Sequence, residues 1–124
     1  MAAEWRRLVR GKEFEVEGDE VIVDVGLERS HRVRVTAEID GLHLEAIVAR
    51  SAVIIAAPEL GRLAWERNRG GSIVGFRLDR KGRLIGEAWV PSIGLERGEL
   101  ELILNHVAAE CDRFEHLLTG KDVE

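Results

Sequence analysis

The clearest pattern in the chain is an alternation of apolar and polar residues on both sides of a short polar turn near residue 80. Apolar positions alternate over residues 73–78, with β-branched and aromatic side chains favoured, and the pattern resumes over 84–90. Residues 79–82 supply turn chemistry. Pro91 ends the second run, because proline lacks the N–H that a strand ladder needs. The pattern predicts a β-hairpin over residues 71–91.

The N-terminal half shows the same two-residue period. Residues 14–25 alternate apolar with charged side chains, and Gly18-Asp19 interrupts them as a candidate turn. Residues 33–39 give the cleanest pattern of a half-buried strand. Asp40-Gly41 is a strong signal for a hairpin turn into a strand that runs from residue 42 to about residue 53. We expect an antiparallel meander of three strands.

Three segments have the helical period instead. A short helix is predicted over residues 2–10, where Gly11 is a plausible stop. A second helix is predicted over residues 58–70, and a longer one over residues 100–118. The apolar stripe of the last helix consists of Leu100, Ile103, Leu104, Val107, Ala108, Cys111, Phe114, Leu117 and Leu118.

These elements predict an α+β fold with a five-stranded antiparallel sheet and the order α-β-β-β-α-β-β-α. A chain of 124 residues is the usual size of one domain. We expect a single domain over residues 1–120, followed by a frayed tail over residues 121–124.

Composition narrows the classes of partner and compartment. The formal net charge is −5, and the arginines are interleaved with glutamates rather than clustered, which argues against nucleic acid. The single cysteine, Cys111, excludes an intrachain disulfide and favours a reducing compartment. The longest apolar run, residues 52–57, is far below the roughly 20 residues that span a bilayer. We expect a cytoplasmic protein with no membrane partner.

A family resemblance emerges from the second half of the chain. A helix that ends at Asn68 is followed by a glycine-aliphatic strand, the turn Leu78-Asp-Arg-Lys-Gly-Arg-Leu84, a loop with Pro91 and a long C-terminal helix. This succession resembles the type III secretion chaperone-like superfamily, with its YbjN-type members and CesT-like fold. The resemblance implies a small, acidic, homodimeric scaffold. Secretion chaperones of this fold hold an unfolded segment of a partner along apolar grooves, partly by strand addition, without nucleotide or metal.

Residues that might carry chemistry give no catalytic, cofactor or metal constellation. His31, His43, His106 and His116 would suit zinc only if three or four such groups met, and we interpret them as surface or boundary residues. Cys111 lies on the apolar stripe and is interpreted as a buried, inert thiol. Glu38 and Glu45 flank the Asp40-Gly41 turn as a candidate carboxylate pair, for which solvated strand-end charges are the favoured interpretation. We therefore expect no enzyme.

The surface offers a more specific hypothesis. Trp65 falls off the main apolar face of the second helix, and Trp89 adjoins Pro91, so one or both are candidates for an interface, with core packing as the alternative. The candidate protein-binding or dimer surface consists of Leu60, Leu63, Trp65 and Trp89. The favoured function is a non-catalytic, homodimeric chaperone-like or adaptor protein that binds an unfolded or extended protein client. The alternative is a small-molecule-binding or regulatory module.

Overall fold

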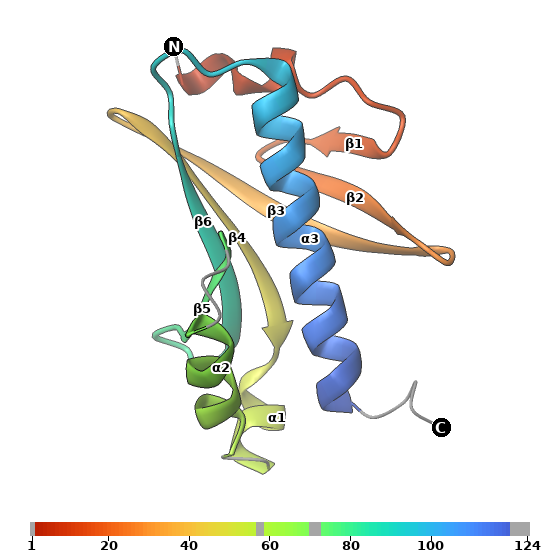
Figure 1. The fold of residues 1–124 in the computed structure, drawn as a ribbon, viewed down its shortest axis with the longest axis vertical. Helices are drawn as coiled ribbons and strands as arrows, with labels where there is room; N and C mark the ends of the chain where they lie inside the picture. The colour runs from red at the N-terminus through yellow and green to blue at the C-terminus, as the bar shows by residue number, and fades with distance from the viewer. Residues whose placement is uncertain (1, 57–58, 70–72, 120–124) are drawn as a thin grey trace.

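A twisted antiparallel sheet of six strands forms the centre of the fold, and one long helix crosses it (Figure 1). The structure is a computed structural model, which describes residues 2–56, 59–69 and 73–119. Its elements are η1 (Ala2–Leu8), β1 (Phe14–Glu17), β2 (Glu20–Gly26), β3 (Arg29–Glu38), β4 (Gly41–Ala49), α1 (Ser51–Ala56), α2 (Leu60–Asn68), β5 (Gly75–Leu78), β6 (Leu84–Pro91) and α3 (Arg97–Thr119). The strand order in the sheet is β1-β2-β3-β4-β6-β5. The predicted α+β class with an antiparallel sheet is confirmed.

The predicted number of five strands is wrong, because the first predicted strand is itself a hairpin. Gly18 adopts a positive φ of 62°, and β1 and β2 pair from Glu17 opposite Glu20 to Phe14 opposite Val23. The chain reverses here while apolar residues on both sides of the turn still face the core. The candidate turn at Gly18-Asp19 therefore separates two strands, and the prediction had counted them as one.

The predicted strand over residues 42–53 ends earlier than expected. β4 stops at Ala49, and α1 starts at Ser51 with the carbonyl of Arg50 accepting hydrogen bonds from the N–H groups of Val53 and Ile54. None of the side chains of α1 is buried. An apolar run without a clear period is compatible with either element, so the sequence alone did not locate this boundary.

The core lies between the sheet and α3. Valines of β2 and β3 and leucines of β4 alternate into it, and α3 contributes its predicted stripe as far as Phe114. Leu117, the next residue of that stripe, is instead 58% exposed, and the side chain of Leu118 lies outside the described part of the chain. Phe76 of β5 meets Phe114 of α3 edge to face, with ring centroids 4.9 Å apart. The N-terminal segment forms as a 3-10 helix and contributes Trp5 and Val9 to the same core. The predicted apolar face of the C-terminal helix is thus its packing face.

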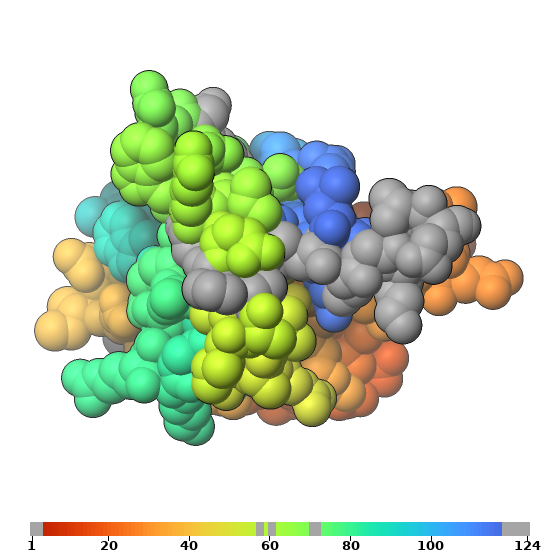
Figure 2. All heavy atoms as spheres, turned by 90° about the horizontal axis from the view of Figure 1, so that it is seen from below, coloured from red at the N-terminus to blue at the C-terminus, as the bar shows by residue number. Residues whose placement is uncertain are grey.

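The predicted second helix lies on the same face of the sheet as α3. It begins at Leu60 and ends at Asn68, and its predicted flanking residues Pro58 and Gly70 lie outside the described residues. Arg67 of α2 lies over the ring of Phe114, with its guanidinium carbon 4.6 Å from the ring centroid, so α2 is on the α3 side of the sheet. Figure 2, seen from below, shows α1 and α2 side by side at this end of the molecule. The tail over residues 121–124 lies outside the described residues.

Candidate functional site

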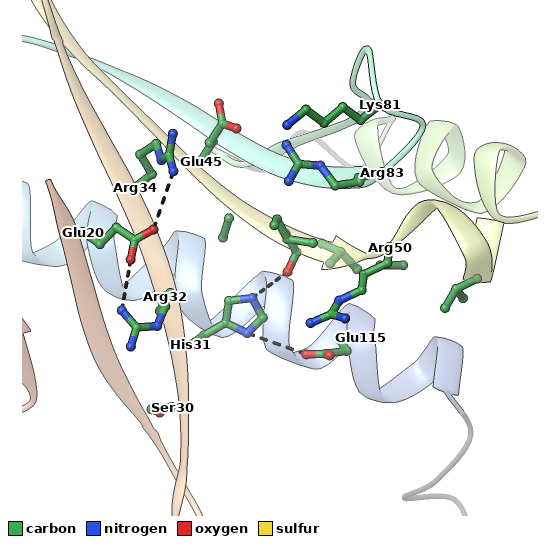
Figure 3. A pocket seen from close by; sticks show the side chains of 15 residues that line it. Glu20, Ser30, His31, Arg32, Arg34, Glu45, Arg50, Lys81, Arg83 and Glu115 are labelled. Atoms are coloured by element: carbon green, nitrogen blue, oxygen red, sulfur yellow. Dashed lines mark hydrogen bonds and ion pairs between the residues drawn. The ribbon is translucent and has the colours of Figure 1, made fainter.

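The sheet opens between β3 and β4 at the end where α3 terminates. These two strands pair from Glu38 opposite Gly41 to Arg34 opposite Glu45, and no further. Beyond that point β3 continues to pair with β2, and β4 with β6. Figure 3 shows the two strands diverging, with side chains from both directed into the space between them. The divergence produces a pocket of about 590 Å³.

Basic side chains dominate the wall of this pocket, although the chain as a whole is acidic. The basic residues are Arg32, Arg34, Arg50, Lys81 and Arg83, and the acidic ones are Glu20, Glu45 and Glu115. Arg32 lies 3.0 Å from Glu20, and Arg83 lies 2.7 Å from Asp79. By contrast, the side chains of Arg50 and Lys81 make no ion pair with any described residue. The pocket therefore has unneutralised positive charge, which suits an acidic group of a ligand or partner.

A buried charge cluster lies between the pocket and α3. Asp112 of α3 is only 5% exposed, and among the described residues it is the one charged side chain that is buried. Its Oδ2 accepts hydrogen bonds from Nε and Nη2 of Arg29, at 3.0 and 2.8 Å. Nδ1 of His31 is 3.8 Å from Oδ1 of Asp112 and also 3.8 Å from Oε1 of Glu115. The cluster joins the start of β3 to the last turns of α3.

The hydrogen bond on the other side of the imidazole fixes the orientation of His31. Its Nε2 lies 2.8 Å from the carbonyl oxygen of Ile47, across the gap between β3 and β4. A carbonyl oxygen can only accept, so Nε2 carries the proton. Nδ1 is then the ring nitrogen that faces the two carboxylates. His31, Asp112 and Glu115 are the group in the described chain whose spacing would allow a metal ion to be held.

The sheet face opposite α3 bears a second polar network. Nε2 of His43 donates to Oε1 of Glu87 at 2.7 Å, and Nε of Arg77 donates to Oε2 of the same carboxylate at 2.8 Å. Burial by itself would raise the pKa of Glu87, but the hydrogen bonds from Arg77 and His43 outweigh it and hold this pKa below its usual value. Glu87 is therefore a carboxylate that ties β4, β5 and β6 together.

Trp89 occupies the same open face. It pairs across the ladder with His43, its side chain is half exposed at 50%, and its ring lies over Gly41. A Cβ on Gly41 would come within 2.5 Å of Cζ2 of Trp89. The glycine of the predicted Asp40-Gly41 turn thus leaves room for an exposed indole.

The proposed interface residues fall on two surfaces. Leu63 and Trp65 are exposed on α2, at 40% and 58%, whereas Trp89 is on the opposite side of the sheet. Leu60 begins α2, but its side chain is outside the described part of the chain. The described side chains of this set, those of Leu63, Trp65 and Trp89, therefore form two separate patches, one on α2 and one on β6.

The other candidate residues from the sequence lie at separate places in the fold. His106 is exposed on α3, and Cys111 is fully buried, with burial raising the pKa of its thiol to about 12. Glu38 and Glu45 do not face each other, because the register places Glu45 opposite Arg34. The sequence relates His31 only to the other histidines, and no local pattern indicates its acidic partners. Asp112 carried one available signal, a charge directly beside the apolar stripe of α3.

Comparisons with known proteins support the fold. No protein-family model and no curated protein matches this sequence. Among solved structures, the chain is similar to a chain of the crystal structure of the ExsC–ExsE complex, with a TM-score of 0.64 and 18% sequence identity. The match covers 95% of this chain and 96% of the other. This likeness confirms the predicted type III secretion chaperone-like fold. No helix in the described ranges is long and apolar enough to cross a membrane.

Proposed function

We propose that this protein is a non-catalytic, chaperone-like or adaptor protein of the cytoplasm, which binds an extended segment of a partner protein and acts as a homodimer. The observation that carries the proposal is the likeness in fold, over nearly the whole chain, to a chain from a complex that contains a secretion chaperone and its partner. Two exposed apolar surfaces and the pocket between β3 and β4 give this proposal a structural basis.

The open face of the sheet supports the binding of a partner. The helices α2 and α3 pack on the other face, so Trp89 and Ile47, at 50% and 42% exposure, remain accessible. A half-exposed tryptophan supplies a large contact area at a small cost in side-chain entropy. Arg77 and Glu87 beside it offer polar groups to an adjoining chain. This combination of an aromatic anchor and a polar surround is typical of a protein-binding surface.

The surface of α2 is the proposed homodimer contact. Leu63 and Trp65 are exposed there, and β5 is the edge strand beside them. The side chain of Asn68 pairs with both backbone groups of Phe76: its Nδ2 donates to the carbonyl at 2.8 Å, and its Oδ1 accepts from the N–H at 2.7 Å. Because Asn68 occupies this part of the β5 edge, we propose that the dimer uses side chains of α2 rather than a continuous ladder.

Light scattering at micromolar concentration tests the dimer. The expected mass is twice the 13.9 kDa of one chain, and Leu63→Glu should reduce it to the mass of one chain. Leu102→Glu is the matched control, because Leu102 is 55% exposed on α3 and away from the proposed contact. A monomeric wild-type protein would contradict the dimer without contradicting the binding of a partner.

Co-purification from the source cell tests partner binding. The wild-type protein should retain a stoichiometric protein partner, Trp89→Ala should lose it, and Leu102→Ala should keep it. A wild-type protein that recovers no protein partner would contradict the proposed function.

The pocket between β3 and β4 favours one alternative, a module that binds a small anionic molecule. Its volume lies within the usual range of ligand sites, roughly 300–1,000 Å³, and Arg50 and Lys81 leave positive charge available in it. Native mass spectrometry separates the alternatives. A bound metabolite of defined mass without a protein partner would support this second function.

A further inference from the structure

We infer that His31, Asp112 and Glu115 form a binding site for a divalent first-row transition-metal ion, with Zn²⁺ as the ion best suited to the donor set. The inference goes beyond the proposed function and does not depend on it. One imidazole nitrogen and two carboxylate oxygens are the donors that zinc accepts beside thiolate. The site lies where β3, β4 and α3 meet, and not on an exposed acidic patch.

The spacing of the three donor atoms suits ligands that share one ion. Nδ1 of His31 is 3.8 Å from a carboxylate oxygen of Asp112 and 3.8 Å from one of Glu115, and all three atoms lie within 4.8 Å of one another. These separations are too long for hydrogen bonds. Donors that share an ion at bond lengths of about 2.0–2.2 Å lie roughly 3–4 Å apart. Asp112 and Glu115 are three residues apart on α3, so they share one face of the helix.

Neighbouring residues hold the donor groups in position. The carbonyl of Ile47 accepts the Nε2 proton of His31 and so leaves Nδ1 as the nitrogen that faces the carboxylates. Arg29 holds Oδ2 of Asp112 with two hydrogen bonds, and no described residue donates one to Oδ1. Both side chains are about nine-tenths buried. Metal ligands in proteins are commonly oriented in this way, with the second nitrogen of the histidine on a carbonyl and the carboxylate itself hydrogen-bonded.

The charges around the two carboxylates favour a bound cation. Arg29 pairs with Asp112 at 2.8 Å, and Nε2 of His116 lies 3.9 Å from the same Oδ2, whereas no described arginine or lysine forms an ion pair with Glu115. A cation held by both carboxylates would also pair with Glu115. His31 and Glu115 also line the pocket between β3 and β4, which gives an ion a route from solvent and leaves a coordination position open. Arg50 extends toward Glu115 in Figure 3, so its positive charge would oppose a cation bound there.

Calorimetric titration of the metal-free protein with ZnCl₂ tests the site. One equivalent of Zn²⁺ per chain is expected, and His31→Gln should weaken binding by about 100-fold or more, because the nitrogen donor is lost. His106→Gln is the matched control, since His106 is exposed on α3, and its affinity should equal that of the wild type. Arg50→Gln should tighten binding several-fold, because it removes a neighbouring positive charge. A purely structural role for the cluster would not produce this gain.

If His31→Gln fails to fold, NMR of the wild-type protein tests the metal site instead. The ring nitrogen resonances of His31 should shift at Nδ1 on addition of one equivalent of Zn²⁺, while those of His106 should not. Absence of a stoichiometric binding event, or binding that shifts His106 and leaves His31 unchanged, would overturn the inference. Neither result would bear on the binding of a partner protein, which is measured separately.

Discussion

Gly86 of β6 lacks a side chain at the point where the sulfur of Cys111 on α3 comes nearest to the sheet. A Cβ at Gly86 would collide with Sγ of Cys111 and would lie 3.0 Å from the ring of Phe76. This absence of a side chain allows α3 to pack closely on β6, and the Phe76–Phe114 pair forms beside it. The contact therefore sets the distance between helix and sheet.

Gly86→Ala should destabilise the protein by about 1–3 kcal/mol, because the added methyl group overpacks a core that is already filled. Urea unfolding measures the free energy. The double variant Gly86→Ala with Cys111→Ala should recover part of the loss, since removal of the sulfur makes room for the methyl group. Gly75→Ala is the control: a Cβ there meets no atom within 4 Å, so a comparable loss at this position would contradict the explanation.

The thiol of Cys111 should be unreactive in the folded protein. Burial raises its pKa to about 12, so only about one thiol in 10,000 is ionised at pH 8. Reaction with a disulfide reagent at pH 8 should be very slow in buffer and complete in denaturing urea. Rapid modification of the native protein would show that Cys111 is accessible, contrary to its position under α3.

Glu101 should make the attachment of the N-terminal segment dependent on pH. Its carboxylate accepts the backbone N–H groups of Arg10 and Gly11, at 2.7 and 2.9 Å, and these bonds hold the pKa of Glu101 below its usual value. A carboxyl group whose pKa is lower in the folded than in the unfolded state stabilises the fold above the unfolded pKa, and this contribution is lost as pH falls through the folded pKa.

Glu101→Gln provides the measurement. At pH 7 the variant should be less stable than the wild type by about 1–3 kcal/mol, since hydrogen bonds to a charged acceptor are replaced by neutral ones. The difference should shrink as pH falls from about 5 toward 3, because the wild-type carboxyl is then protonated. A difference in unfolding free energy that stays constant over this range would contradict the role given to the Glu101 charge.

Asn68 should stabilise the edge of the sheet. Its amide satisfies the N–H and the carbonyl of Phe76, a residue that is only 5% exposed. Asn68→Ala should cost about 1–3 kcal/mol because it leaves these groups without their partner. Asn105→Ala is the control, since Asn105 makes no side-chain hydrogen bond to a described residue of the chain. Equal effects of the two substitutions, measured by thermal unfolding, would refute the capping role.

The spacing of apolar residues predicted those strands and helices in which burial repeats regularly along the chain. The alternation in β3 and β4 gave their buried faces, and the stripe of α3 gave its packing face, because burial there repeats with the backbone period. Asn68 entered the sequence analysis as part of a family resemblance, and the structure explains it through its two bonds to Phe76. The turn at Gly18 was a candidate from sequence, although the strands on its two sides were counted as one, whereas the short helix α1 was missed because its apolar run has no clear period.

The sequence by itself determined the α+β class, the faces of the strands and the helix that covers them, since these follow from interactions between residues close in the chain. Only the tertiary structure decided where the strands separate and which charges meet there. Arg29 and Asp112 are 83 positions apart, and they meet because β3 leaves β4 beyond Arg34 and passes beneath the last turns of α3. The register of the sheet and the angle of the helix bring His31, Asp112 and Glu115 together, and no local period encodes either of them.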